Sequence, residues 1–231
     1  MQLIDALPEF DSRLLTVSEG RRLLTRNDPL LFAAVYLPHK LKTQDKLTLN
    51  QFHLDIAAYA QSWIGPLGKP AEHRDCFIAP RSCGKSTWIF HILPLWAAAH
   101  GHKRYIVAFS DSEDQAMGWL RNFKMELDSN ALLQADFPEL CDLYKRTERS
   151  KAYMDNRNAT QRANGFVFQA KGVDSAILGA NIGGTRPEVI LFDDIEPPEA
   201  NYGATELKKR KQTILTTHFY LNTNAIVAFV G

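Results

Sequence analysis

One short stretch, residues 75–87, restricts what this chain can fold into more than any other. A short apolar run leads into a loop of small residues, and Gly84, Lys85 and Ser86 then open an amphipathic segment over residues 88–99. A strand, a small-residue loop and a helix in this order are the context that a phosphate-binding P-loop requires. The alternative is a chance Gly-Lys-Ser at an ordinary strand-to-helix turn, and the register of both flanking elements favours the P-loop.

The loop departs from the P-loop pattern at one position, because Ala79 stands where the first glycine is expected. Pro80 offers a reason, since a proline pushes the preceding residue into the extended region, where alanine meets no steric penalty. We expect Lys85 to reach the β- and γ-phosphates of ATP and the Ser86 hydroxyl to ligate Mg²⁺. The backbone amides from Ser82 onward can converge on the same anion at the helix start. The predicted nucleotide-binding residues of this loop are Ala79, Pro80, Arg81, Ser82, Cys83, Gly84, Lys85, Ser86 and Thr87.

Length and composition set broad limits on the rest of the chain. Its 231 residues suffice for one α/β domain with a small appendage. The formal net charge is only +1, so any contact with DNA must be local. Three cysteines without C-x-x-C spacing indicate neither a disulfide framework nor a zinc site. No signal peptide and no membrane-spanning apolar run is seen, which predicts a reducing cytoplasm.

The segment before the loop is predicted to be helical. Residues 1–48 contain short helical patterns at 17–24 and 29–36, which we interpret as a cap on the core. A helix is expected over residues 49–63, with Asn50 as its N-cap. Gln51, at the exposed start of that helix, could pair with an adenine edge. A solvated glutamine is an equally good interpretation.

After the loop, strands and helices alternate. Residues 104–109 and 165–170 are predicted strands, and a helix is expected between them after Ser112. This order favours a parallel sheet with right-handed crossovers. Residues 130–164 form the least regular part, and the basic run at 208–211 is interpreted as the exposed face of a helix.

A second motif follows the apolar run at residues 189–192, which is typical of a central parallel strand. Asp193, Asp194 and Glu196 come directly after it. Acidic residues at the carboxyl end of a strand near a P-loop are placed to hold Mg²⁺ and to orient a water molecule. Asp193 is the candidate on the metal side. Asp194 or Glu196 would orient the water, and the sequence leaves both open.

These residues resemble the ATPase domain of large terminase subunits, the motors that drive double-stranded DNA into viral capsids. The similar features are Phe52 and His53 at a helix start, the loop at 80–86 and the block at 186–196. The resemblance covers roughly residues 49–231, and the acidic block is its most specific part. It implies a P-loop NTPase fold of the additional-strand, RecA-like type, a mostly parallel sheet flanked by helices, with residues 1–48 as a cap.

The resemblance also implies cofactors and partners. ATP and Mg²⁺ would power translocation of double-stranded DNA into a procapsid, in the cytoplasm of an infected bacterial cell. A portal protein and a small terminase subunit would be the protein partners. The assembled state would be a homo-oligomeric ring, and the isolated chain a monomer.

Further expectations concern arginines and missing parts. Arg81 matches the arginine that the family carries in its loop, and Arg186 is the nearest other candidate for an arginine finger, because relatives often place an arginine where Gly183 and Gly184 stand. The strand at 225–231 resembles the family's coupling strand, without the small hydroxyl residue that normally follows. We therefore expect an excised domain that lacks the family's nuclease domain and does not cut DNA.

Two other classes share the loop. A small-molecule kinase would usually place its metal-binding strand directly beside the P-loop strand, whereas the strand at 104–109 intervenes here in sequence. A helicase or another kind of translocase would need a second RecA-like domain.

Overall fold

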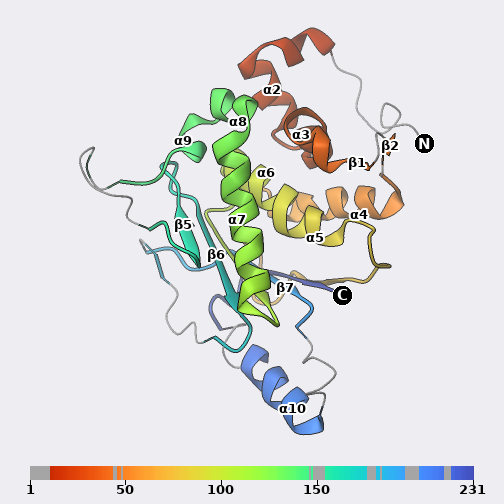
Figure 1. The fold of residues 1–231 in the computed structure, drawn as a ribbon, viewed down its shortest axis with the longest axis vertical. Coiled ribbons are helices and arrows are strands. Elements are labelled where there is room, and N and C mark those ends of the chain that lie inside the picture. The colour runs from red at the N-terminus through yellow and green to blue at the C-terminus, as the bar shows by residue number, and fades with distance from the viewer. Residues whose placement is uncertain are drawn as a thin grey trace.

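A computed structural model describes residues 11–43, 46–47, 49–145, 147, 154–175, 181–182, 184–195, 203–215 and 220–231. Glu196 and Gly183 lie outside these described residues. The described chain is an α/β fold in which helices flank a six-stranded, mostly parallel sheet (Figure 1).

The strand order differs from the chain order. Five strands are parallel and the last is antiparallel, in the spatial order β3 (Arg74–Phe77), β8 (Ile226–Val230), β7 (Val189–Asp193), β4 (Tyr105–Ser110), β6 (Val167–Gly172) and β5 (Ala159–Gln161). Every residue of β4 and β7 is buried, as expected for strands covered on both faces. β3 alternates between exposed and half-buried residues at the sheet edge.

The two faces of the sheet have separate cores. On one face, alternate strand residues such as Ile106 and Leu191 pack against the helices that follow β3 and β4. On the other face, Phe109, Phe192 and Phe229 stack across three neighbouring strands, with ring centroids 5.2 and 4.7 Å apart. Such parallel stacking adds to the area that the rings bury and fixes the register of the strands.

The helices cover the sheet as Figure 1 shows, with α7 lying across it. The loop after β3 leads into α5 (Lys85–Thr87), a π-helical segment (Trp88–Ile92) and α6 (Leu93–His100). The helix predicted as amphipathic at 88–99 is instead buried on all sides over residues 88–98, and a π-turn interrupts it. α7 (Glu113–Ser129) begins where predicted, because the Ser112 hydroxyl accepts the Gln115 amide at 3.2 Å.

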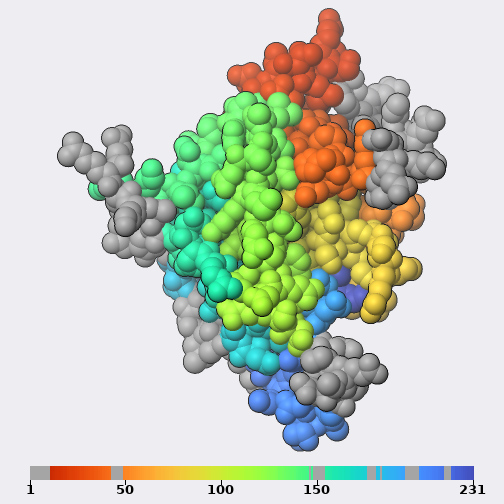
Figure 2. Space-filling model, in the orientation of Figure 1, coloured from red at the N-terminus to blue at the C-terminus, as the bar shows by residue number. Residues whose placement is uncertain are grey.

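The N-terminal helices lie at one end of the molecule and α10 (Ala204–Thr213) at the other (Figure 2). The elements before the loop are η1 (Ser12–Thr16), α2 (Ser18–Thr25), α3 (Pro29–Tyr36), η2 (Pro38–Lys40), β1 (Lys42–Thr43), β2 (Lys46–Leu47), α4 (Gln51–Tyr59) and η3 (Ala60–Trp63). α2, α3 and α4 agree with the predicted helical patterns. Phe32 and Tyr36 of α3 belong to the same buried core as the helix after β3.

Residues 130–164, which we expected to be the least regular part of the chain, contain only short elements in their described portion. The segment contains α8 (Ala131–Asp136), α9 (Pro138–Cys141) and β5. Asn130 starts α8, because its Oδ1 atom accepts the amides of Leu132 at 3.2 Å and Leu133 at 3.1 Å.

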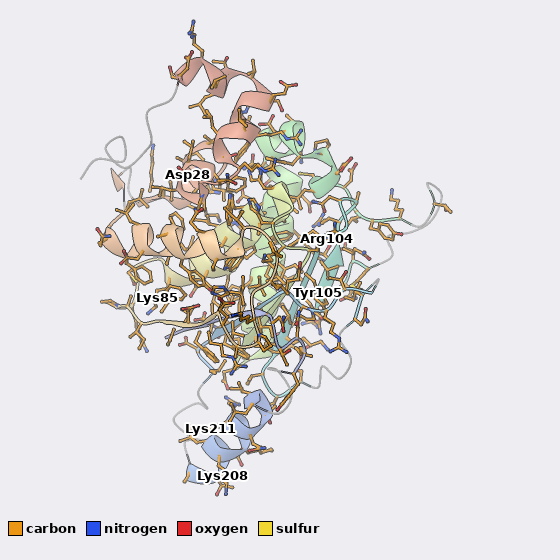
Figure 3. All side chains as sticks on the ribbon, turned by 180° about the vertical axis from the view of Figure 1, so that it is seen from behind. Asp28, Lys85, Arg104, Tyr105, Lys208 and Lys211 are labelled. Atoms are coloured by element: carbon orange, nitrogen blue, oxygen red, sulfur yellow. The ribbon has the colours of Figure 1, made fainter. Side chains whose placement is uncertain are left out.

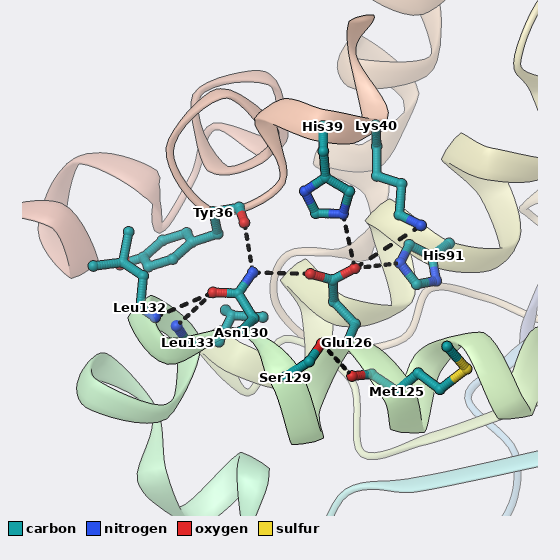
Figure 4. Close-up of polar contacts among 10 residues, drawn as sticks. All are labelled: Tyr36, His39, Lys40, His91, Met125, Glu126, Ser129, Asn130, Leu132 and Leu133. Carbon is teal, nitrogen blue, oxygen red and sulfur yellow. Dashed lines mark hydrogen bonds and ion pairs between the residues drawn. The ribbon is translucent and has the colours of Figure 1, made fainter.

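A polar cluster centred on Glu126 joins the N-terminal segment to the helix after β3 (Figure 4). One carboxylate oxygen lies 3.0 Å from His39 Nε2 and 3.4 Å from His91 Nε2, and the other accepts from Asn130 Nδ2 at 2.9 Å. Burial would raise the pKa of Glu126, but the bonds from His91, Asn130 and His39 prevail and lower that pKa to about 2. The cluster therefore holds an ionised carboxylate where three elements meet.

Within the described part of the chain, no helix combines the length and the apolar character needed to cross a bilayer.

Candidate functional site

The carboxyl edge of the sheet brings the two sequence motifs together. β8 lies between β3 and β7, and Asp193, the last residue of β7, pairs in register with Val230. The Ser86 hydroxyl, at the start of the helix after β3, donates to Asp193 Oδ2 across 3.1 Å. Two residues that are 107 positions apart in sequence thus meet at one point.

The backbone of the loop between β3 and α5 turns sharply. Ser82 has a φ of +65° and Gly84 a φ of +81°. A Cβ atom on Gly84 would lie 3.3 Å from His53 Nε2, so both the positive φ and the close neighbour favour glycine. Left-handed residues that alternate with right-handed ones are typical of backbone concavities that bind anions.

His53 fixes this loop from outside. Its Nδ1 atom accepts the Asn50 amide at 3.0 Å, so Nε2 carries the proton and donates it to the Cys83 carbonyl at 2.8 Å. Burial lowers the pKa of His53, which keeps the ring neutral. The start of α4 and the loop are therefore held in one arrangement.

Lys85 lies on the inside of the same loop. Its ammonium donates to the Ala79 carbonyl, and it also stabilises the charge of Asp193. Pro80 and Arg81 are exposed, whereas Cys83 and Thr87 are half-buried. The loop thus offers one enclosed cation and one exposed cation at the carboxyl edge of the sheet.

Asp193 is a buried carboxylate with few positive neighbours. Burial, and next the repulsion from Asp194, raise the pKa of Asp193 to about 6, against the opposing effects of the Ser86 hydrogen bond and the Lys85 charge. A carboxylate in this state gains from an added cation. Asp194 is exposed, with a φ of +43°, a strained conformation for a residue other than glycine.

No protein-family model matches the chain, and a search of curated proteins found no match either.

The Ser86–Asp193 pair fits a magnesium ion bound together with a nucleotide. Mg²⁺ usually takes one or two protein carboxylates or hydroxyls and completes its shell with phosphate and water. Throughout the described residues, no group of three or more His, Cys, Asp or Glu side chains could hold a metal by itself. Such a pair would suit a site in which a bound nucleotide supplied the rest of the metal shell.

Two other predicted site residues form no contact with this pair that the structure shows, and a third lies outside the described residues. Gln51 is exposed at the start of α4, and its amide donates to Asp55 Oδ1 at 2.9 Å on the same helix. Arg186 is exposed in the turn before β7, at the amino edge of the sheet and so at the end opposite to Lys85. Glu196 falls outside the described residues, so the choice between Asp194 and Glu196 stays open.

One residue of this edge was missed by the sequence reasoning. Arg210 of α10 was predicted to be exposed, but only 13% of its side chain is accessible. Its guanidinium donates to Asp111, to Asp174 at 2.7 Å and to the Ile195 carbonyl at 3.0 Å. A signal was present in the sequence, because Leu207 and Ile214 lie three positions before and four positions after Arg210, on the same side of the helix.

Proposed function

We propose that this chain is an ATPase of the additional-strand P-loop type. The observation that carries the proposal is the contact between Ser86 and Asp193, which joins the start of the helix after the loop to the acidic strand end. A hydroxyl from the loop and a carboxylate at the end of another strand of the same sheet are the protein ligands that P-loop NTPases use for Mg²⁺.

The strand order supports the additional-strand type over a small-molecule kinase. β8 lies between β3 and β7, so the strand that carries Asp193 is not the direct neighbour of the strand before the loop. Kinases with this loop usually place the two strands side by side. The order therefore favours hydrolysis, with water as the acceptor.

Each residue would have a distinct task. The loop amides and Lys85 would bind and orient the phosphates of ATP. Ser86 and Asp193 would hold Mg²⁺, which when bound neutralises the charge on the phosphates. Asp194 or Glu196 would orient the attacking water and accept its proton.

We further propose that hydrolysis drives double-stranded DNA into a viral procapsid, as the resemblance to large terminase subunits implies. The chain would then work as a ring, with a portal protein and a small terminase subunit as partners, in an infected bacterial cell. The arginine that stabilises the transferred phosphoryl group would be Arg81 or Arg186.

The test measures phosphate release from ATP in the presence of Mg²⁺. The reaction is run without any addition, with double-stranded DNA, with single-stranded DNA and with small phosphoacceptors. Lys85→Ala should abolish hydrolysis while the fold remains, because Lys85 neutralises phosphate charge and adds little stability. Lys69→Ala, at an exposed lysine on the amino side of β3, is the matched control. Normal turnover by a folded Lys85→Ala variant would refute the site. Stimulation by a small acceptor alone would indicate a kinase, and stimulation by single strands alone a helicase.

A further inference from the structure

The helix α10 carries the densest run of positive charge in the described chain. Lys208, Lys209 and Lys211 are exposed, and none of their three ammonium groups forms a hydrogen bond or an ion pair with a described residue. Figure 3 shows Lys208 and Lys211 on a helix that projects from the body of the molecule. Since the whole chain has a net charge of only +1, this patch is local.

Arg210, within the same run, points the other way. Each residue of an α-helix turns by about 100°, so the three lysines occupy the half of α10 opposite to Arg210. We call these three residues the lysine face. The helix therefore presents an unpaired cationic face outward and a paired arginine inward.

Arg210 contacts the ends of three strands at once. Asp111 follows β4, Asp174 follows β6, and Ile195 follows β7, so all three acceptors lie at the carboxyl edge of the sheet. Hydrogen bonds between ionised partners are about twice as strong as neutral ones. The position of α10 is thus tied to the edge that also holds Asp193.

The contact between Arg210 and Ile195 affects Asp194, the residue with the strained backbone. Ile195 comes immediately after Asp194, whose positive φ persists only if its surroundings hold it in place. Arg210 holds the carbonyl on one side of Asp194, and the pairing of β7 holds Asp193 on the other. A displacement of α10 would therefore change the geometry of residues 193–195.

We infer that the lysine face of α10 binds the phosphate backbone of double-stranded DNA, and that Arg210 transmits this binding to the turn at residues 193–195. The part of this inference that concerns regulation rests on the proposed function, because the regulated reaction is ATP hydrolysis. Charge complementarity identifies the partner, because three unpaired ammonium groups within four residues match the regular negative charge of a duplex. Arg210 is a positioning residue in this scheme, and it does not contact the substrate.

The first experiment tests binding alone, without nucleotide. Anisotropy of a labelled duplex is measured over a series of salt concentrations for the wild type and for Lys208→Ala/Lys209→Ala/Lys211→Ala. Each lost phosphate contact should reduce the slope of log K against log salt by about 0.9, so the triple variant should lose about 2–3. A control triple variant removes the exposed Lys42, Lys69 and Lys145, with the same change in charge.

Equal slopes for the two triple variants would overturn the inference. So would tighter binding of the wild type to anionic lipid vesicles or to polyglutamate than to the duplex at the same salt, because the partner would then be a membrane or an acidic protein. This experiment does not depend on hydrolysis, so it distinguishes failure of the lysine face from failure of the proposed ATPase.

The second experiment tests the transmission. The ratio of hydrolysis with duplex to hydrolysis without it is measured for Arg210→Lys, Arg210→Gln and Asp174→Asn. Arg210→Gln should keep the salt slope of the wild type for duplex binding but bring the hydrolysis ratio close to one. Arg210→Lys should retain part of the stimulation by the duplex. A purely structural role would lower stability in each variant and leave the ratio unchanged, and that result would overturn the role of Arg210.

Discussion

His53 donates its Nε2 proton to the carbonyl oxygen of Cys83 at 2.8 Å, while its other ring nitrogen accepts the amide of Asn50. This pair of bonds allows only one neutral tautomer. It also connects a helix start to a loop 30 residues further along the chain. The loop that we propose to bind phosphate is therefore tied to the start of α4 through the Cys83 carbonyl.

His53→Ala should weaken nucleotide binding about tenfold, because the loop loses one hydrogen bond of about 1 kcal/mol and gains freedom. Isothermal titration with a non-hydrolysable ATP analogue measures the change. His73→Ala, a histidine on the amino side of β3, is the control and should bind as the wild type does. Equal affinities for both variants would show that the His53 contact does not preorganise the loop.

Asp193→Asn should stabilise the chain at neutral pH. The folded chain raises the pKa of Asp193 from 3.8 to about 6, so the contribution of this group to stability is complete below pH ~4 and is lost as the pH rises through ~6. Asp193→Asn has no ionisable group at this position, so the variant does not lose this stability as the pH rises. Its free energy of unfolding should equal that of the wild type near pH ~4 and exceed it by about 3 kcal/mol near pH ~7.

Urea unfolding over this pH range, without Mg²⁺, measures the difference. Asp142→Asn, which removes an exposed carboxylate, is the matched control variant. A constant difference between Asp193→Asn and the wild type at all pH values would contradict the raised pKa.

Asp194→Asn should keep nucleotide binding and reduce hydrolysis by about 100-fold or more, if Asp194 orients the attacking water. Asparagine tolerates positive φ, so the strained backbone remains acceptable. Glu196→Gln is the matched comparison and should remain active. The reverse outcome, an inactive Glu196→Gln with an active Asp194→Asn, would assign the water to Glu196.

Hydrolysis per chain should be low in dilute solution and should increase with protein concentration, because we expect an arginine from a neighbouring chain. Such an arginine contributes about 10³–10⁵ in rate. Arg186 lies at the sheet edge opposite to Lys85, so it can serve only a neighbour, whereas Arg81 lies on the loop itself.

Mixing inactive variants separates these two arginines. Lys85→Ala mixed with Arg186→Ala should recover activity, because each chain supplies what the other lacks. Lys85→Ala mixed with Arg81→Ala should not recover. High activity that does not vary with concentration, in a chain that sedimentation shows to be monomeric, would exclude an arginine in trans.

Much of the fold could be predicted from local patterns. The buried run at 189–193 and the spacing of apolar residues in α7 gave correct elements, because burial imposes a period of two or 3.6. The contact between Ser86 and Asp193 also agrees with the expected placement of the two motifs at one sheet edge.

Two features were not predicted, each for its own physical reason. The π-turn at Trp88–Ile92 does not change which residues are apolar, so the apolar pattern of the sequence gives no sign of it. Arg210 was grouped with its neighbouring lysines by charge, whereas its burial depends on two aspartates that lie 99 and 36 positions away. Local patterns carry no information about such distant partners.

The strand order also determines when the site can form during synthesis. β8 pairs with β3 on one side and β7 on the other, yet it is made after both. Until residues 226–230 have left the ribosome, β3 has no neighbour in the sheet and β7 has an unpaired edge. A nascent chain therefore carries the complete loop and the acidic strand well before they can meet, and it should need protection from aggregation during that interval.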